Sequence, residues 1–214
     1  MQLTPHSKLV FIGDSITDCG RERPIGEGNG LGNGYVSLIN AMLAAAYPDK
    51  PVRVLNVGSS GNTVSDLAKR WQTDVLDLKP DWLSIMIGIN DVWRQFDSPL
   101  QIEGHVGLED YTATLKDLIK KAQPHLKGLI LMTPFFIESN RSDRMRSMMD
   151  RYGAVVRQLA DENQAVFVDT QAAFDTYLEH NHSMSLAWDR VHPNLTGHML
   201  LARAFLKKID YKLW

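Results

Sequence analysis

Residues 8–15 read KLVFIGDS, an apolar run that leads directly into the small polar turn Gly13-Asp14-Ser15. Four further apolar runs follow along the chain, and none of them alternates with polar residues. Such runs are typical of strands that are buried on both faces, as in a parallel sheet with helices on either side. The sequence therefore predicts five strands, over residues 9–13, 52–57, 82–87, 129–132 and 166–168.

Longer amphipathic segments separate these runs. They predict helices over residues 35–46, 64–78, 108–122, 144–162 and 195–209. Strands and helices that alternate in this way wind into an α/β fold, here with a five-stranded parallel sheet. Right-handed crossovers bring the carboxyl ends of the strands to one edge, where open sheets of this kind hold their ligands.

The composition limits the kinds of partner to expect. The 214 residues fit one domain, 1–214, and 23 basic against 25 acidic residues leave no charge field that would attract nucleic acid or an anionic membrane. We expect a small, largely neutral partner. Cys19 is the only cysteine and the first residues lack the features of a secretory signal, which favours a reducing, cytoplasmic location. His180 and His182 are too few for a metal site, and we expect no metal and no cofactor.

Polar clusters follow three of the predicted strands. Ser15 comes after the first, Gly61 lies in GSSGNT after the second, and Asn90 lies in GIND after the third. Far along the chain, DRVHP places Asp189 and His192 three residues apart. A serine hydroxyl is a good nucleophile only when a base removes its proton and a third group fixes the tautomer of that base. We predict that His192 is the base for Ser15 and that Asp189 orients it.

The same edge carries candidate donors for the oxyanion that acyl transfer creates. We predict that the backbone amides of Ser15 and Gly61 and the side-chain amide of Asn90 form this oxyanion hole. Gly61 has no side chain to hinder a close approach, although a turn also favours glycine at such a position. Asn90 is also a common residue type at the start of a helix.

Together, these motifs resemble those of the SGNH-hydrolase family, also called GDSL esterases, over nearly the full length of the chain. Ser15 matches the first family motif, Gly61 the second, Asn90 the third, and Asp189 with His192 the last. The resemblance implies a three-layer α/β/α, flavodoxin-like fold and the hydrolysis of carboxylic esters through an acyl-enzyme. The chain lacks the G-x-S-x-G motif of lipases and α/β-hydrolases around its serine, which makes that other fold the weaker choice.

Within the family, residues 14–21, 85–94 and 187–193 are most similar to intracellular bacterial acetylxylan esterases. This resemblance implies removal of acetyl groups from xylan-derived oligosaccharides inside the cell. Trp93 lies just beyond Asn90, and Trp188 lies just before Asp189. Because aromatic faces suit sugar rings, we predict that both tryptophans contact the substrate.

Two other functions stay open at this point. A lysophospholipase or thioesterase would need an apolar channel for a long acyl chain, and the sequence shows no separate lid or membrane-surface segment. A catalytically silent carbohydrate-binding protein would use the same fold, but the intact set of Ser15, Asp189 and His192 argues against it. We expect aromatic residues such as Trp214 to be exposed, which favours a homo-oligomer.

Overall fold

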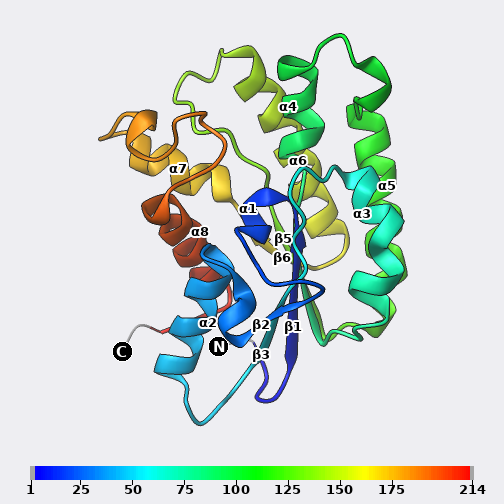
Figure 1. Cartoon of the computed structure of the whole chain (residues 1–214), viewed down its shortest axis with the longest axis vertical. Coiled ribbons are helices and arrows are strands. Elements are labelled where there is room, and N and C mark those ends of the chain that lie inside the picture. Colours follow the sequence, from blue (N-terminus) through cyan, green and yellow to red (C-terminus); the bar gives the residue numbers. More distant parts are fainter. Residues whose placement is uncertain (1–2, 213–214) are drawn as a thin grey trace.

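A central sheet runs through the computed structural model, which describes residues 3–212 (Figure 1). Within these residues the sheet has six strands, in the order β2-β3-β1-β4-β5-β6. Their bounds are Lys8–Gly13 (β1), Gly26–Glu27 (β2), Arg53–Asn56 (β3), Trp82–Met86 (β4), Gly128–Met132 (β5) and Val166–Val168 (β6). All five strands predicted from apolar runs are confirmed, to within one residue at either end. Trp214 lies outside the described residues.

The prediction of a five-stranded parallel sheet is wrong in one respect, because β2 adds a sixth, antiparallel strand. Gly26 pairs with Asn56 and Glu27 with Leu55 of β3, whereas the other strand pairs are parallel. β2 is only two residues long and lies at the edge of the sheet. A short edge strand has few apolar contacts to make, so no apolar run marks it in the sequence.

The five parallel strands follow the order of a flavodoxin-like fold. Without β2, the strands lie in the order second, first, third, fourth, fifth. Val10 in β1 lies between Leu55 in β3 and Leu83 in β4, so the winding reverses between β1 and β4. At such a reversal a crevice opens beside the carboxyl ends of the strands. The segments that follow these two strands begin with Asp14-Ser15 and with residues 87–90.

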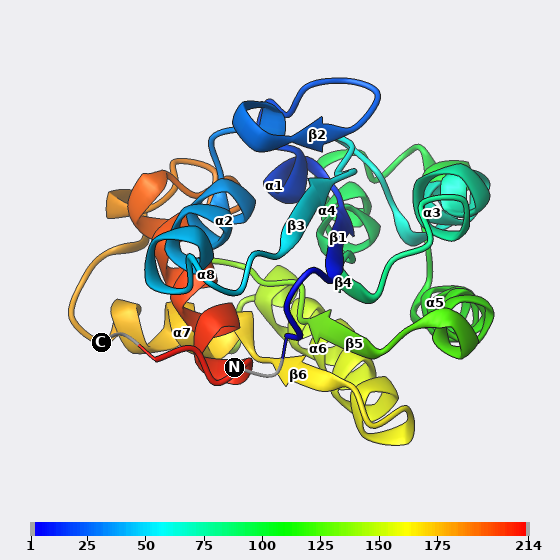
Figure 2. The same cartoon turned by 90° about the horizontal axis from the view of Figure 1, so that it is seen from below.

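Helices cover both faces of the sheet. Viewed from below, α2, α7 and α8 lie on one face, and α3, α5 and α6 lie on the other (Figure 2). The bounds are Ser15–Asp18 (α1), Tyr35–Ala46 (α2), Val64–Trp71 (α3), Ile89–Asp97 (α4), Leu108–Ala122 (α5), Arg144–Glu162 (α6), Thr170–Leu178 (α7) and Leu195–Lys208 (α8). The expected three-layer α/β/α arrangement is confirmed.

The helices also differ from the sequence prediction in two ways. The sequence did not predict α1, α4 and α7, which have nine residues or fewer and therefore show no clear helical period. The helix predicted over 64–78 is divided, because α3 ends at Trp71 and Gln72–Leu76 form a π-helical turn. In this wider turn the amide of Asp77 donates to the carbonyl of Gln72 at 2.9 Å, and Val75 stays buried.

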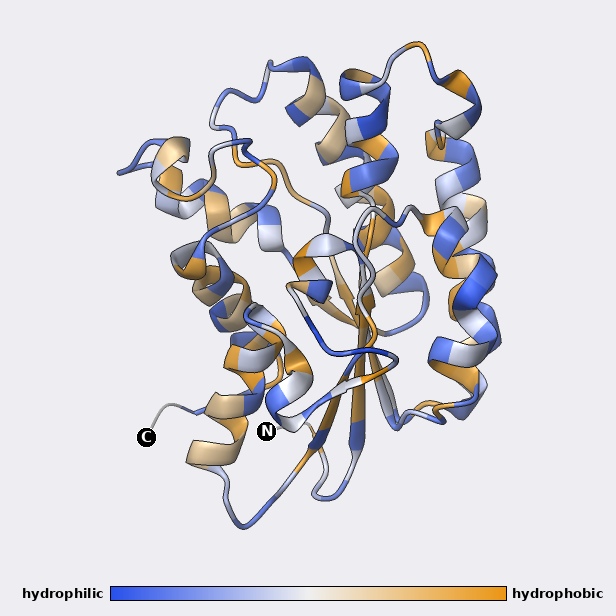
Figure 3. Ribbon diagram, viewed as in Figure 1, coloured by the Kyte–Doolittle hydropathy of each residue, from blue (hydrophilic) through white to orange (hydrophobic). Residues whose placement is uncertain are grey.

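The core lies on both sides of the parallel strands. Val10, Phe11 and Ile12 of β1 are completely buried, and apolar residues dominate the strands at the centre of the molecule (Figure 3). Full burial of one such side chain contributes about 1.5–3 kcal/mol, so the sheet is a firm base for the loops at its carboxyl edge. Among residues 3–212, no helix is both long enough and apolar enough to cross a bilayer.

Candidate active site

Ser15 lies at the point where β1 turns into α1. Asp14 caps this helix, because its Oδ1 accepts a hydrogen bond from the amide of Ile16 at 3.0 Å. The turn places the Ser15 side chain at the carboxyl edge of the sheet. There its Oγ lies 2.8 Å from Nε2 of His192, a residue 177 positions further along the chain.

Asp189 and His192 form a compact turn that orients the imidazole. Nδ1 of His192 lies 2.7 Å from Oδ2 of Asp189. The other carboxylate oxygen of Asp189 accepts hydrogen bonds from the backbone amides of Val191 and His192, at 2.9 and 2.8 Å. Arg190, inside the turn, has a φ of 62°, in the left-handed region that bulky residues seldom adopt. The three predicted residues are therefore brought into one hydrogen-bonded chain.

The charge of Asp189 favours the tautomer that a base requires. Partial burial opposes ionisation of this carboxyl group, but the hydrogen bonds from His192 and Val191 outweigh it and hold the pKa of Asp189 below its usual value of 3.8. A carboxylate at this position keeps the imidazole proton on Nδ1 of His192. Nε2 is then free to accept the proton of the Ser15 hydroxyl.

The predicted oxyanion donors lie on the segments that follow β1, β3 and β4. Gly61 has a φ of 80°, and the space where a Cβ would lie has no atom within 4 Å. The amides of Ser15 and Gly61 have no acceptor among residues 3–212. Asn90 lies in the first turn of α4 and is buried, and its Nδ2 donates to the carbonyl of Asn62 at 3.0 Å. Asn90 therefore begins a helix and also lies beside the Gly61 loop.

Arg70 of α3 connects the segments that carry these donors. Its guanidinium donates to the carbonyl of Gly13 at 3.0 Å and to the carbonyl of Val57 at 2.6 Å, at the ends of β1 and β3. Its Nε donates to Oδ1 of Asn62 at 2.7 Å, and Asp74 pairs with it at 2.6 Å. One mostly buried side chain thus holds the segments before Ser15 and after Gly61 at a fixed separation.

Two buried carboxyl groups lie in the same region. Oδ1 of Asp91 accepts from the amide of Val64 at 3.0 Å, which links α4 to α3, while its Oδ2 is buried without a partner among residues 3–212. Burial raises the pKa of Asp91 to about 7. Complete burial also raises the pKa of Asp14 to about 7, although the amide of Ile16 and the charge of His192 lower it.

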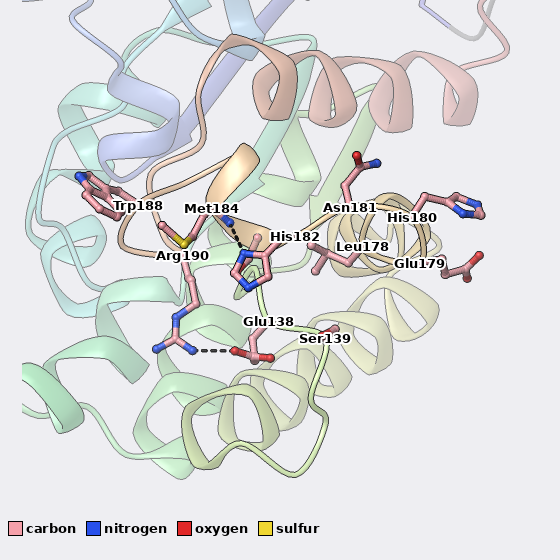
Figure 4. A pocket seen from close by; sticks show the side chains of 11 residues that line it. Glu138, Ser139, Leu178, Glu179, His180, Asn181, His182, Met184, Trp188 and Arg190 are labelled. Atoms are coloured by element: carbon pink, nitrogen blue, oxygen red, sulfur yellow. Dashed lines mark hydrogen bonds and ion pairs between the residues drawn. The ribbon is translucent and has the colours of Figure 1, made fainter.

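The two tryptophans predicted to contact substrate have different surroundings. The ring of Trp93 lies 5.6 Å from the ring of His192 and meets it edge-on, so the structure brings Trp93 to the site. Trp188 is 85% exposed and lines a neighbouring pocket of about 640 Å³. Figure 4 shows Trp188 at one side of this pocket, with the ion pair between Arg190 and Glu138 below it in this view. Among the described residues, no cluster of three or more histidine, cysteine or acidic side chains is arranged to hold a metal.

A serine hydrogen-bonded to a histidine that an aspartate orients, at the carboxyl edge of a parallel α/β sheet, defines the class of serine hydrolases. Residues 11–200 match the model of the GDSL-like lipase/acylhydrolase family. The chain belongs to this family and is a carboxylic ester hydrolase. The family and the reaction type predicted from the sequence are thus confirmed.

Two relatives with solved structures are similar to this chain in sequence and fold over nearly its whole length. An acetylxylan esterase from Geobacillus stearothermophilus is 56% identical over 214 residues, which cover 99% of this chain and 98% of the relative. The crystal structure of this esterase, Axe2, matches with a TM-score of 0.98, and further structures are catalytic mutants of Axe2 with a serine, a histidine or an aspartate replaced by alanine. LAE5, an α/β hydrolase from the metagenome of Lake Arreo in Spain, is 53% identical, with 99% and 98% of the two chains covered and a TM-score of 0.97.

Sequence reasoning missed the residues that support the site. In the sequence, Arg70 and Asp74 have the spacing of an ordinary surface pair on a helix, and nothing shows that the guanidinium also reaches two strand ends. The sequence feature that could have pointed to Asp91 as a supporting residue is its place directly after Asn90. An acidic residue in the first turn of a helix is common, however, so its burial is visible only in the structure.

Proposed function

We propose that this enzyme removes acetyl groups from xylan-derived oligosaccharides, with Ser15 as nucleophile, His192 as general base and acid, and Asp189 as the orienting group. The hydrogen-bonded chain from Ser15 Oγ to His192 at 2.8 Å and on to Asp189 at 2.7 Å carries the mechanism. The choice of substrate is supported by 56% identity to an acetylxylan esterase over nearly the whole of both chains.

In the acylation step, Nε2 of His192 takes the proton of Ser15 as Oγ attacks the acetyl carbon. The carbonyl oxygen becomes an oxyanion, and we assign its hydrogen-bond donors to the amides of Ser15 and Gly61 and to Nδ2 of Asn90. Donors fixed before the charge forms need no reorganisation during the reaction. The imidazolium then gives its proton to the sugar oxygen, the C–O bond breaks and the sugar leaves with a free hydroxyl.

In the deacylation step, water takes the place of the sugar. His192 accepts a proton from the water, whose oxygen attacks the acetyl-serine, and the same three donors stabilise the second oxyanion. The imidazolium returns the proton to Ser15 Oγ, and acetate leaves. The side chain of His192 is 45% exposed, which gives the water a path to Nε2.

The test of this function follows acetate release from acetylated xylo-oligosaccharides, alongside p-nitrophenyl esters of two, four and eight carbons. We expect turnover of the acetylated sugars, and we expect kcat/KM to fall as the acyl chain lengthens. A preference for the eight-carbon ester would instead support the lysophospholipase or thioesterase alternative.

The Ser15→Ala variant is the control for the mechanism. Loss of the nucleophile lowers kcat by about 10⁴-fold or more in enzymes of this kind. The variant should also lose covalent labelling by a fluorophosphonate while its circular dichroism spectrum stays unchanged. Wild-type turnover in a folded Ser15→Ala sample would contradict the assignment.

We also propose that the enzyme acts in the cytoplasm, on oligosaccharides taken up by the cell. The support is the one cysteine, Cys19, which cannot form a disulfide within the chain. Cell fractionation tests this location. The homo-oligomer stays a prediction, and sedimentation velocity that finds only a monomer would contradict it.

A further inference from the structure

A second pocket, of about 420 Å³, lies directly beside the catalytic residues. It is formed by α4, by the amino-terminal turn of α6 and by the segments around Phe136 and Asp189. Its lining includes Trp93, whose ring meets that of His192, and it includes Asp189 itself. The pocket of Figure 4 is lined by none of Ser15, Asp189 and His192. Of these two pockets, the one beside α4 is therefore the one that shares a residue with the catalytic triad.

The reaction itself determines which part of the substrate lies on this side. Nε2 of His192 must protonate the departing oxygen, so the alcohol part of the ester has to lie next to the imidazole. The ring of Trp93 meets that imidazole edge-on and lines the pocket, whereas Asp189, also in the lining, contacts the opposite edge of the imidazole at Nδ1. An alcohol that lies on the Trp93 side of the imidazole therefore points toward the pocket beside α4.

The lining of this pocket combines an apolar base with a charged rim. Phe96 is half-buried, and Phe136 and Met145 are buried, which gives flat and flexible apolar surface. The guanidinium of Arg190 lies 4.8 Å over the ring of Phe136 and pairs with Glu138 at 2.6 Å, so its position is fixed. A sugar ring has apolar C–H faces and a rim of hydroxyl groups, which is the pattern that this lining complements.

Arg144 is the second cation at the rim. It lies in the first turn of α6, where the helix dipole disfavours a positive charge. Its exposed side chain makes no hydrogen bond, ion pair or ring contact with any of residues 3–212. Arg144 therefore brings no evident benefit to stability, and its donors are free for a ligand.

We propose that this pocket binds the xylose ring that carries the acetyl group, and so selects the leaving alcohol. The proposal rests on the function proposed above and adds the place of the sugar. Phe96 contacts a face of the ring, Phe136 supports Arg190 from below, and Arg144 and Arg190 donate to the hydroxyls of the sugar. Phe96 and Arg144 then act on substrate selection rather than on the proton transfers.

The test compares two acetate esters that share the acetyl group and differ in the leaving alcohol. Acetylated xylotriose fills the pocket, whereas ethyl acetate has an alcohol too small to reach its far wall. In Phe96→Ala, kcat/KM for acetylated xylotriose should fall about tenfold further than kcat/KM for ethyl acetate, mainly through KM. In Arg144→Met, the further loss should be about threefold, because the side chain is exposed.

Two control variants keep the test specific. Phe167→Ala removes a half-buried phenylalanine from β6, where its ring lies under Arg157, and Met184→Ala changes the pocket of Figure 4. Neither should alter the ratio of the two kcat/KM values. If Phe96→Ala fails to fold, the Arg144→Met variant still tests the proposal, because it changes an exposed side chain.

The outcomes separate the two proposals. Equal losses on both substrates in Phe96→Ala and Arg144→Met, or a selective loss in Met184→Ala, would overturn the subsite while wild-type sugar deacetylation still supports the function. A wild-type enzyme that cleaves ethyl acetate but releases no acetate from acetylated xylotriose would overturn the function itself.

Discussion

The two sides of Ser15 are built differently. On the oxyanion side, Asn90 is 1% exposed, and side chains from other elements, above all Arg70, link the segments around Gly61. On the acid–base side, the side chains of Asp189 and His192 are 39% and 45% exposed and are oriented by hydrogen bonds within their own turn. One side is held by tertiary contacts and the other mainly by local ones.

This difference in burial and in supporting contacts matches the role of each side in the reaction. Oxyanion donors must point at the developing charge before it forms, because their reorientation would add to the barrier. The imidazole, in contrast, must exchange protons with a sugar oxygen and with water, which requires access to solvent. Damage to the exposed side should therefore act on chemistry alone, whereas damage to the buried side should act on chemistry and stability together.

The largest effect is expected on the exposed side, in Asp189→Asn. The amide still accepts from the backbone amides, but it no longer favours the proton on Nδ1 of His192. An aspartate-to-asparagine change in a buried triad costs about 10⁴ in kcat, and we expect roughly 10³ here because solvent screens the exposed carboxylate. Steady-state hydrolysis of p-nitrophenyl acetate measures the loss, with thermal unfolding nearly unchanged. A loss of less than tenfold would contradict the role of Asp189.

An intermediate effect is expected on the buried side, in Arg70→Met. The carbonyl of Val57 and the side chain of Asn62 lose the donor they have in Arg70, while the carbonyl of Gly13 keeps its hydrogen bond from the amide of Ser59. A buried group that is left unsatisfied costs about 1–3 kcal/mol. The displaced donors should lower kcat by about 10- to 100-fold, less than outright removal of an oxyanion donor. Denaturant unfolding and ester turnover measure the two effects on the same sample.

Arg157→Met is the matched control for Arg70→Met. Arg157 pairs with Asp169 at 2.7 Å, but its side chain is 56% exposed, so we expect a change below about 1 kcal/mol and no change in kcat. If Arg70→Met lowered stability without lowering kcat, the link between the buried contacts and the catalytic geometry would be absent.

The third effect concerns the pH dependence of stability on the buried side. Burial raises the pKa of Asp91 to about 7 from its usual 3.8, so the folded protein keeps a proton that the unfolded chain releases between these values. The contribution of Asp91 is therefore full below about pH 4 and is lost as the pH rises to 7. Each pKa unit corresponds to about 1.4 kcal/mol, which makes about 4 kcal/mol the order of the whole effect.

Asp91→Asn removes this titration but keeps an oxygen to accept from Val64. Urea unfolding from pH 4 to 7 should show the variant gaining stability relative to the wild type as the pH rises. Asp81→Asn is the control of opposite sign, because the hydrogen bond from Lys127 lowers the pKa of Asp81. The stability that Asp81 contributes is therefore lost as the pH drops below about 4, outside the range in which Asp91 titrates. A flat difference between Asp91→Asn and the wild type would show that Asp91 does not titrate in this window.

The sequence predicted the parallel strands well because burial on both faces requires continuous apolar runs such as the one that ends at Gly13. It missed β2, since a two-residue strand at an edge buries little, and it missed α4, which is too short to show a period. It placed Ser15, Gly61 and Asn90 at the ends of successive strands, and the structure brings Ser15 to His192 and Asn90 to the Gly61 loop. It could not tell Trp93, which meets His192, from the exposed Trp188.

The sequence by itself determined the fold class, the family and the identity of the reactive groups, because apolar runs and reactive residue types are local properties of the chain. Only the tertiary structure decided how these groups are held. The contacts of Arg70 with the ends of β1 and β3 and the burial of Asp91 depend on segments far apart in the chain. The pocket beside α4 has the same origin, since a cavity exists only where the surfaces of separate elements meet.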